Sequence, residues 1–314
     1  MTGAIFKLIR DLFPPKSKYS VEDIPDLTGR VIIVTGGNTG IGKETAKALL
    51  AHNAKVYIAG RNQAKVEDAI RDLQSETGKT AIFLKVDLAD LHSVKAGAQS
   101  FLNREKELHV LFNNGGVMNP PVEQITAQGY DLQFGTNSLG HFYFTKLLLP
   151  ALFAGTKTSG DGKARVVNTS SSSHLLGKLD FETLTDTPKR KKQPTFTLYA
   201  QSKFANVVFS KELARRYGDQ GIVSIAVNPG IIDSDLQRHA NNGPVTQLMQ
   251  RSLRYPAAQG ALTQLYVGTS PEGAKLNGKY LIPWARIGNP LEATENAEQA
   301  RELWAWAEEQ VAKI

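Results

Sequence analysis

The sequence predicts a doubly wound α/β fold, in which a mostly parallel sheet of seven strands lies between layers of helices. Two observations lead to this prediction. Short, continuous apolar runs, typical of strands buried on both faces, alternate along the chain with amphipathic helical patterns. A glycine-rich turn also lies directly between the first of these strands, at 31–34, and the helix that follows it. Such alternation favours parallel strands that are joined by right-handed crossovers.

Each strand is predicted from a run rich in β-branched and apolar residues, and each helix from apolar residues three or four positions apart. The strands are expected at 31–34, 55–59, 81–86, 109–112, 165–168, 223–227 and 279–282. The helices are expected after the turn as far as Leu50, and then at 64–75, 91–104, 140–152, 198–217 and 295–313. Two stretches interrupt the alternation, a polar and basic insertion at 175–196 and a loosely amphipathic segment at 234–255. Loops of this kind often carry substrate contacts.

Size and composition indicate one large domain. At 314 residues the chain can bury a substantial core, and we expect this domain to span 30–314 after an N-terminal extension of 1–29. The 37 Lys and Arg residues against 30 Asp and Glu give a formal charge of +7, yet no stretch interleaves arginine with aromatic residues as a nucleic-acid groove would. The absence of cysteine excludes disulfides and thiolate metal sites. We therefore predict a cytoplasmic protein with no metal centre and no nucleic-acid partner.

The first residues of the chain carry an apolar pattern of their own. Apolar side chains between Ile5 and Phe13 are interrupted by Lys7, Arg10 and Asp11. This segment is too short and too charged to cross a bilayer. We expect an amphipathic helix that either packs on the domain or makes peripheral contact with a membrane surface.

The glycine-rich turn predicts a dinucleotide site. Residues 35–42 read TGGNTGIG and lead from the first strand into a helix, whose free N–H groups and partial positive charge suit a pyrophosphate. A P-loop is disfavoured, because Glu44 follows Lys43 where a serine or threonine would hold magnesium. In a Rossmann-type fold, the residues expected to bind the dinucleotide here are Gly36, Asn38, Thr39, Gly40, Ile41 and Gly42.

The end of the second strand bears on the choice of cofactor. An acidic side chain at that place would accept hydrogen bonds from the adenosine ribose and repel a 2′-phosphate. In this chain Gly60 stands there and Arg61 follows, so a planar cation is available for a phosphate. We therefore expect NADP(H) as the cofactor, with NAD(H) as the alternative.

Tyr199 and Lys203 form a candidate acid/base pair. They lie four residues apart in the stretch YAQSKFAN, within a helical pattern, so both side chains share one helix face. A neighbouring ammonium favours the phenolate and would lower the tyrosine pKa toward working pH. The pair is then suited to exchanging a proton with an alkoxide or an alcohol. The spacing alone is common, so its meaning depends on the other motifs.

Together these motifs resemble the short-chain dehydrogenases/reductases, in the subfamily whose turn reads TGxxxGIG and whose active site reads YxxxK. The resemblance covers about 30–282, with the motifs in family order and spacing. The pattern VNTSSSSH, followed by a long insertion and YAQSKFAN, is similar to the branch of retinol dehydrogenases and WW-domain-containing oxidoreductases. The resemblance implies an oxidoreductase that moves hydride between NADP(H) and a carbonyl or alcohol.

The resemblance also implies roles for individual residues. Asp87 and Leu88 match the pair that contacts the adenine ring, and 113–116 match the turn along the adenosine and ribose. Asn137, in TNSLGHF, matches an asparagine that kinks its helix and holds a water in the proton relay. The segment 228–234 resembles the one that lies along the nicotinamide. The implied cofactor residues from these regions are Asp87, Leu88, Asn114, Gly115, Gly116, Tyr199, Lys203, Pro229, Gly230, Ile232 and Ser234.

The catalytic serine is harder to place. The run of four serines ends at Ser173, which is 26 residues before Tyr199 (199 minus 173), whereas the serine of the family usually precedes the tyrosine by little more than a dozen. The retinol dehydrogenase-like branch has the same enlarged gap. Aligning VNxSSxxH places the serine at Ser171, with Ser172 as the alternative. We expect His174 to cap or line this loop, and no GxSxG elbow supports a hydrolase triad.

The predicted catalytic residues are therefore Asn137, Ser171, Tyr199 and Lys203. The resemblance implies a small apolar aldehyde, ketone or alcohol as substrate, with retinoids, lipid aldehydes and secondary-metabolite ketones as alternatives. Residues expected to line the substrate site are Leu236, Leu248, Met249, Leu253 and Trp284.

Two further alternatives concern function and assembly. A catalytically silent cofactor sensor or scaffold of the same fold is disfavoured, because the chain keeps both Tyr199 and Lys203. The family pairs helices equivalent to 140–152 and 198–217 across a dimer, but the additional termini of this chain offer a cover for that face. A monomer and a homodimer are both compatible with the sequence.

Overall fold

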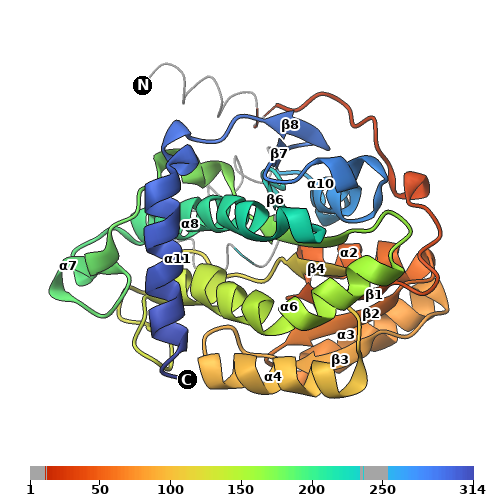
Figure 1. The fold of residues 1–314 in the computed structure, drawn as a ribbon, viewed down its shortest axis with the longest axis horizontal. Coiled ribbons are helices and arrows are strands. Elements are labelled where there is room, and N and C mark those ends of the chain that lie inside the picture. Colours follow the sequence, from red (N-terminus) through yellow and green to blue (C-terminus); the bar gives the residue numbers. More distant parts are fainter. Residues whose placement is uncertain (1–10, 12, 234–235, 237–253) are drawn as a thin grey trace.

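The computed structural model describes residues 11, 13–233, 236 and 254–314 (Figure 1). The helix expected at the N-terminus lies almost wholly outside the described residues. Four other residues named from the sequence also lie outside the described residues: Ser234, Leu248, Met249 and Leu253.

One sheet of eight strands forms the centre of the protein, in the order β3-β2-β1-β4-β5-β6-β7-β8. The strands are β1 (Val31–Thr35), β2 (Lys55–Gly60), β3 (Ile82–Lys85), β4 (Val110–Asn113), β5 (Ala164–Thr169), β6 (Ile222–Val227), β7 (Tyr280–Ile282) and β8 (Arg286–Gly288). The first seven run parallel to one another, and β8 pairs antiparallel with β7. The mostly parallel, doubly wound sheet is confirmed.

The predicted number of seven strands is wrong by one, because β8 gives no strand signal in the sequence. It has three residues, and its central Ile287 is 60% exposed. A strand this short at the edge of a sheet needs no buried apolar run, so a search for such runs does not find it.

Helices cover both faces of the sheet. They are α2 (Gly40–Ala51), α3 (Gln63–Thr77), α4 (Leu91–Arg104), α5 (Leu132–Phe134), α6 (Gly140–Thr158), α7 (Pro188–Lys191), α8 (Thr195–Tyr217), α10 (Ala257–Thr269) and α11 (Ala297–Val311). Buried residues of α2, α3 and α10 pack on one face, and those of α4, α6 and α8 pack on the other. Figure 1 shows α11 crossing over α8 and α6 on the outside of this second layer.

Helix α10 was not predicted, because it lacks the contrast between an apolar and a polar face. Thr263 and Gln264 are as deeply buried as Leu265. The helix also packs closely on the sheet, since a Cβ on Gly268 would lie 2.3 Å from the ring of Phe112. A helix buried on most sides carries no amphipathic period, so its sequence pattern is weak.

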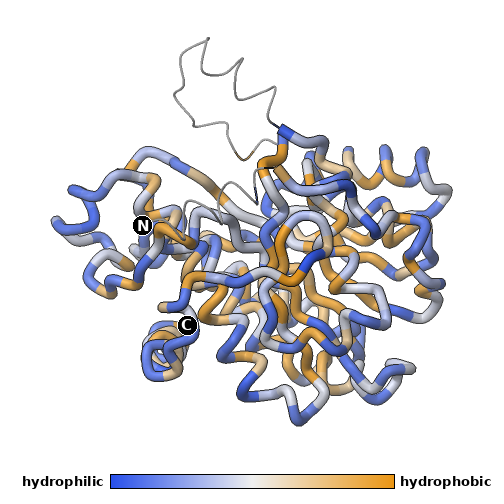
Figure 2. The backbone as a smooth tube through the Cα atoms, turned by 90° about the horizontal axis from the view of Figure 1, so that it is seen from above, coloured by the Kyte–Doolittle hydropathy of each residue, from blue (hydrophilic) through white to orange (hydrophobic). Residues whose placement is uncertain are grey.

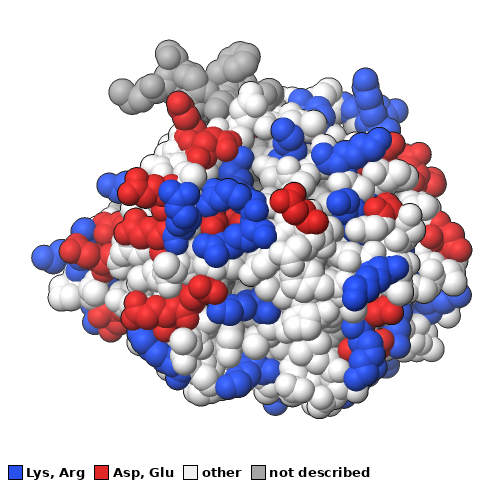
Figure 3. All heavy atoms as spheres, viewed as in Figure 1, with Lys and Arg blue, Asp and Glu red and all other residues white. Residues whose placement is uncertain are grey.

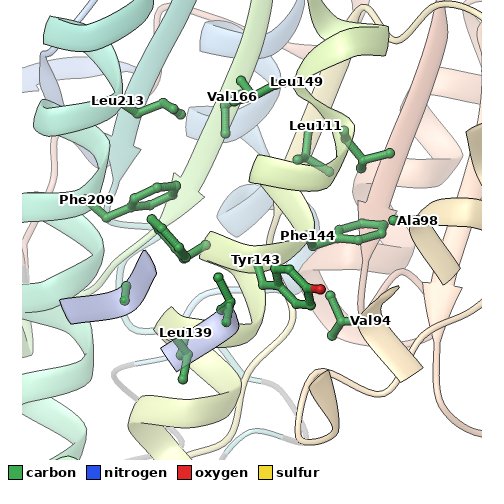
Figure 4. Packing of buried hydrophobic residues seen from close by; sticks show 14 of the residues in the cluster. Val94, Ala98, Leu111, Leu139, Tyr143, Phe144, Leu149, Val166, Phe209 and Leu213 are labelled. Carbon is green, nitrogen blue, oxygen red and sulfur yellow. The ribbon is translucent and has the colours of Figure 1, made fainter. Parts of the chain in front are cut away.

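The core lies between the sheet and the two helix layers. Hydrophobic residues follow the central strands, whereas hydrophilic residues occupy the peripheral segments (Figure 2). On the face covered by α4 and α6, Tyr143 and Phe144 point toward Val94 and Ala98 (Figure 4). This packing holds the beginning of α6, and the segment before it, firmly against the sheet.

The C-terminal helix α11 covers the outer apolar side of α6 and α8. The ring centroid of Trp304 lies 5.0 Å from that of Phe142 and 5.9 Å from that of Phe209. The guanidinium of Arg216 lies 4.5 Å from the centroid of the same indole. The cover that the terminus was expected to offer is therefore present on these two helices.

On the face seen in Figure 3, Lys and Arg residues are interspersed with Asp and Glu. Among the described residues, none of the helices has the length and apolarity needed to cross a membrane. The same residues hold no cluster of histidine and acidic side chains arranged to bind a metal ion.

Candidate active site

A cavity of about 1430 Å³ lies at the carboxyl ends of the parallel strands. Residues that follow four of these strands line it: Gly36 after β1, Arg61 after β2, Asn114 after β4 and Ser170 after β5. The strand order reverses at β1, between β2 and β4. In open α/β sheets this switch point is where ligands bind.

The turn after β1 leads into α2 and leaves the first N–H groups of this helix available to a ligand. Gly36 has a φ of 64°, a conformation that favours glycine. A Cβ on Gly42 would lie 2.3 Å from the carbonyl oxygen of Gly36, so α2 can begin this close to the turn only with glycine. Thr39 makes no capping hydrogen bond with its side chain, and Gly40 and Ile41 line the cavity. The first turn of α2 can therefore offer its N–H groups to a pyrophosphate.

Two cationic side chains border the cavity beyond β2. Arg61 was expected there, whereas Lys65 was not. Asn62 caps α3 by accepting the N–H of Lys65 at 3.0 Å, which places this lysine in the first turn of the helix. The signal in the sequence is its position four residues after Arg61, just inside a capped helix. Gly60 leaves little room for an acidic side chain, because its Cβ would lie 2.8 Å from Val66.

Helix α8 places Tyr199 and Lys203 on the cavity, and both are 3% exposed. The Lys203 Nζ lies 5.7 Å from the centroid of the Tyr199 ring and donates to the Thr169 carbonyl at 3.0 Å. Burial lowers the pKa of Lys203 to about 8. Burial also raises the pKa of Tyr199 to about 12, and a hydrogen bond with Ser171 offsets only part of this effect.

The expected lowering of the tyrosine pKa by Lys203 is thus not present in this structure. Both groups lie outside water, and desolvation favours the neutral form of each. Tyr199 is therefore protonated near neutral pH, although the raised pKa makes it a weaker acid than an ordinary tyrosine.

Within the run of four serines, Ser171 is the one whose hydrogen bond with Tyr199 lowers the pKa of the phenol. Its Oγ accepts the N–H of Ser173 at 3.1 Å, which starts a short 3₁₀ turn over Ser172–Leu176. The fully buried His174 accepts the N–H of Leu291 at Nε2 (3.2 Å), so its Nδ1 carries the proton and donates to the Ser171 carbonyl at 2.7 Å. His174 thereby holds the backbone of Ser171 and has no proton-accepting nitrogen left for catalysis.

Asn137 lies within a π-helical turn over Gly135–Leu139, between α5 and α6. Its side chain is fully buried; Oδ1 accepts the N–H of Val117 at 2.8 Å, and Nδ2 donates to the Val117 carbonyl at 3.0 Å. A Cβ on Gly116 would lie 2.9 Å from the Asn137 Oδ1 and 3.8 Å from the Lys203 Nζ. Gly116 thus allows the loop after β4 to pass close to both side chains.

His141 is a buried residue of this region that the sequence did not single out. The His141 Nδ1 lies 3.0 Å from the Asn137 carbonyl, which can only accept, so Nδ1 carries the proton and donates it. The His141 Nε2 therefore accepts from the Thr35 hydroxyl at 2.8 Å, and the same hydroxyl lies 3.2 Å from the Phe112 carbonyl. The Thr35 oxygen accepts the N–H groups of Asn114 and Gly115, each at 2.9 Å. Burial lowers the pKa of His141 to about 4, so this chain of hydrogen bonds stays neutral and links the end of β1 to Asn137.

The cavity brings together nearly all the residues that the sequence assigned to it. The predicted residues that line it are Gly36, Asn38, Thr39, Gly40, Ile41, Gly42, Arg61, Asp87, Leu88, Asn114, Gly115, Gly116, Ser171, Tyr199, Lys203, Pro229, Gly230 and Ile232. Asn137 lies behind this lining and reaches it through Val117. Leu236 lines the cavity as expected, but Trp284 does not; its ring packs edge-on against Tyr255 at 5.0 Å.

Beyond Tyr199 the cavity is bordered by two segments whose role the sequence left open. One is the loop 117–121, after β4, and the other is the start of α8 at 195–196, which the sequence assigned to the insertion. We call the part of the cavity between them the substrate half. Its lining residues include Met118, Asn119, Pro120, Pro121, Leu132, Thr195 and Phe196. No motif marks these residues, because they come from separate segments that only the fold brings together.

A family model described as short chain dehydrogenase matches residues 30–181 and 187–244. The chain belongs to the short-chain dehydrogenase/reductase family. A short-chain dehydrogenase/reductase of Armillaria gallica is 57% identical over 306 residues, covering 98% of each chain. Human retinol dehydrogenase 12 is 39% identical over 279 residues, covering 88% of this chain and 85% of its own, in agreement with the predicted branch. The solved RhlG/NADP active-site complex of Pseudomonas aeruginosa has a TM-score of 0.66 at 25% identity and covers 82% and 95% of the two chains.

Short-chain dehydrogenases/reductases are oxidoreductases that bind a nicotinamide dinucleotide. The cavity of this member fits such a group. The open N-terminus of α2 suits the pyrophosphate, and Arg61 and Lys65 provide positive charge at the end where the adenosine is expected. Tyr199 and Lys203 border the same cavity at the end where the nicotinamide is expected.

Proposed function

We propose that the protein is an NADP(H)-dependent oxidoreductase that interconverts the carbonyl and the alcohol of a small apolar substrate, with reduction as the favoured direction. The observation that carries this proposal is the position of Ser171, Tyr199 and Lys203 on the same cavity as the glycine-rich turn. A bound nicotinamide would exchange hydride with the substrate carbon. All other steps of the reaction fall to side chains of this chain.

The proton and the developing charge are handled by three side chains. Ser171 is placed to donate to the substrate oxygen as negative charge develops there. Tyr199, whose pKa burial raises to about 12, gives its proton to that oxygen. The ammonium of Lys203 then stabilises the phenolate. Asn137 holds the loop at Val117 in its place on the cavity.

A screen of purified protein with NADPH and aldehydes or ketones of increasing size tests this proposal directly. NADPH oxidation with at least part of the series is the expected result. Tight NADPH binding without turnover of any carbonyl or alcohol would instead support a silent cofactor sensor or scaffold.

The choice between the two serines is tested by a matched pair of variants. Ser171→Ala should lower kcat by about a hundredfold, because it removes the hydrogen-bond donor that adjoins Tyr199. Ser172→Ala should stay within about threefold of the wild type, since a hydroxyl at Ser171 is retained. Steady-state kinetics with one carbonyl substrate measure both, and the reverse order of effects would assign the role to Ser172.

The preference for NADP(H) is tested at Arg61. Arg61→Ala should weaken NADPH binding by about ten- to a hundredfold, because a charge-assisted contact with the 2′-phosphate is lost, and should change NADH binding little. Lys79→Ala, at an exposed position just after α3, is the control for a simple change of net charge. Fluorescence titration gives the Kd values. A wild type that binds NADH as tightly as NADPH would contradict the assignment.

A further inference from the structure

Buried contacts hold the insertion at 175–196 against the segment that precedes Asn137. Arg190 of α7 is fully buried, with its Nη1 3.3 Å from Asp131 and its Nη2 2.7 Å from Asp186. The backbone N–H of Asp131 also donates to the carbonyl of Leu184 at 2.9 Å. Removing one partner of a buried ion pair is costly, so the insertion and this segment form one unit.

Gln133 lies at the centre of this unit. The Asp131 carboxylate accepts the N–H groups of Gln133 and Phe134, at 3.0 and 2.9 Å, and thereby starts α5. The Gln133 side chain is 1% exposed and has both ends of its amide engaged. Its Oε1 accepts the N–H of Asn119 at 2.9 Å, and its Nε2 donates to the carbonyl of Thr195 at 2.8 Å.

The two partners of this amide belong to the two segments that border the substrate half. Asn119 lies in the loop 117–121, and Thr195 is the first residue of α8, directly before Phe196. The ring centroid of Phe196 lies 6.4 Å from that of Tyr199. One buried side chain therefore joins both walls of the cavity next to the proposed catalytic tyrosine.

We propose that Gln133 is a positioning residue that sets the width of the substrate half, and so the bulk of the carbonyl substrate that is accepted. The proposal rests on the proposed function of the same cavity. Gln133 itself does not touch substrate or cofactor; it acts through the backbone at Asn119 and Thr195. Because a buried amide with unsatisfied ends is unfavourable, Gln133 holds the loop 117–121 and the start of α8 at a fixed distance from each other.

Matched variants separate this role from a general contribution to folding. Gln133→Met keeps the length of the side chain and removes both hydrogen bonds. Gln201→Met is the control, since Gln201 is also buried and holds the same insertion through the N–H of Asp180 and the hydroxyl of Thr183, outside the cavity lining. The measurement is kcat/KM for a series of aldehydes and ketones of increasing size, together with KM for NADPH.

The ratio of kcat/KM between the bulkiest and the smallest substrate should change by about tenfold in Gln133→Met. The KM for NADPH should stay within about twofold, because neither Asn119 nor Thr195 is among the residues expected to bind the cofactor. Gln201→Met should leave the ratio unchanged. An unchanged ratio in Gln133→Met, or the same change in both variants, would overturn the proposal.

A second measurement does not depend on turnover. Hydrogen–deuterium exchange of the peptide around Asn119 should be at least about tenfold faster in Gln133→Met, because the N–H loses its acceptor. Gln133→Glu keeps an acceptor for this N–H and loses the donor to Thr195, so exchange at Asn119 should stay near the wild-type rate. Unchanged exchange in Gln133→Met would refute the proposal. If the wild type reduces no carbonyl but the exchange rates are as expected, the proposed function is refuted and the link that Gln133 makes between Asn119 and Thr195 still stands.

Discussion

Replacing Tyr199 by phenylalanine should lower kcat by about a thousandfold, because the proton donor to the substrate oxygen is removed. The ring and its packing are retained, so the Kd for NADPH should change by less than about threefold. Turnover is measured by NADPH oxidation and binding by fluorescence titration. Substantial activity in Tyr199→Phe would refute the role of this residue.

Tyr143→Phe is the matched control for this substitution. Tyr143 is 6% exposed in α6, and burial raises its pKa as it does for Tyr199, but it packs in the core beside α4, outside the cavity lining. The same loss of a buried hydroxyl at this position should leave kcat within about twofold of the wild type. A large loss of activity in both variants would point to damage of the fold.

Replacing Lys203 by methionine should abolish most activity and also weaken cofactor binding, since the lysine is proposed to stabilise the phenolate and is also among the residues expected to bind the cofactor. In the wild type, reduction should slow as the pH rises above about 8, because Lys203 loses its proton there. This alkaline decline should be missing from the residual activity of Lys203→Met. A loss confined to kcat, with unchanged binding of NADPH, would contradict the double role.

The same substitution should stabilise the fold. The pKa of Lys203 falls from 10.5 to about 8 on burial, so the unfolded chain binds its proton more tightly than the folded protein does. The resulting cost is fully present below pH 8 and disappears as the pH rises toward 10.5. Lys203→Met removes up to about 3 kcal/mol of this cost at pH 7. The carbonyl of Thr169 keeps a partner, because Asn206 Nδ2 also donates to it at 3.0 Å.

Denaturant unfolding at pH 7 and at pH 10 measures this effect. The free energy of unfolding should be higher in Lys203→Met than in the wild type at pH 7, and the difference should shrink at pH 10. A variant that is less stable than the wild type at pH 7 would show that the lysine contributes more through its contacts than burial of its charge costs.

The cofactor turn and the Tyr199 and Lys203 pair were accessible from the sequence because local geometry determines them. A helix places residues four apart on one face, and a glycine turn between strand and helix has few other uses. The same locality explains why Arg61 was found and Lys65 was missed. Arg61 stands at a place that a known contact defines, whereas no known motif includes Lys65, which is marked only by its place in the first turn of α3 after the Asn62 cap.

The remaining features depend on burial and on contacts between distant segments, which a single sequence does not display. The direction of the Tyr199 pKa is one example, because desolvation of the phenol outweighs its hydrogen bond with Ser171. His141 and Gln133 are others, since each is an ordinary helix residue until the fold places Thr35 beside the first, and Asn119 and Thr195 beside the second. Helix α10 was not predicted for the same reason, because its polar residues are buried.

The π-turn at Gly135–Leu139 has a consequence for how this helix tolerates changes in length. A π-turn holds one residue more than a regular α-helical turn, so deleting a single residue there would restore an uninterrupted helix. Every residue on one side of the deletion would then rotate by about 100° relative to the other side. Asn137 would leave Val117, and His141 would leave Thr35, although the hydrophobic composition of the helix would hardly change. Insertions and deletions should therefore be excluded from these five positions in working relatives, even where individual side chains are free to vary.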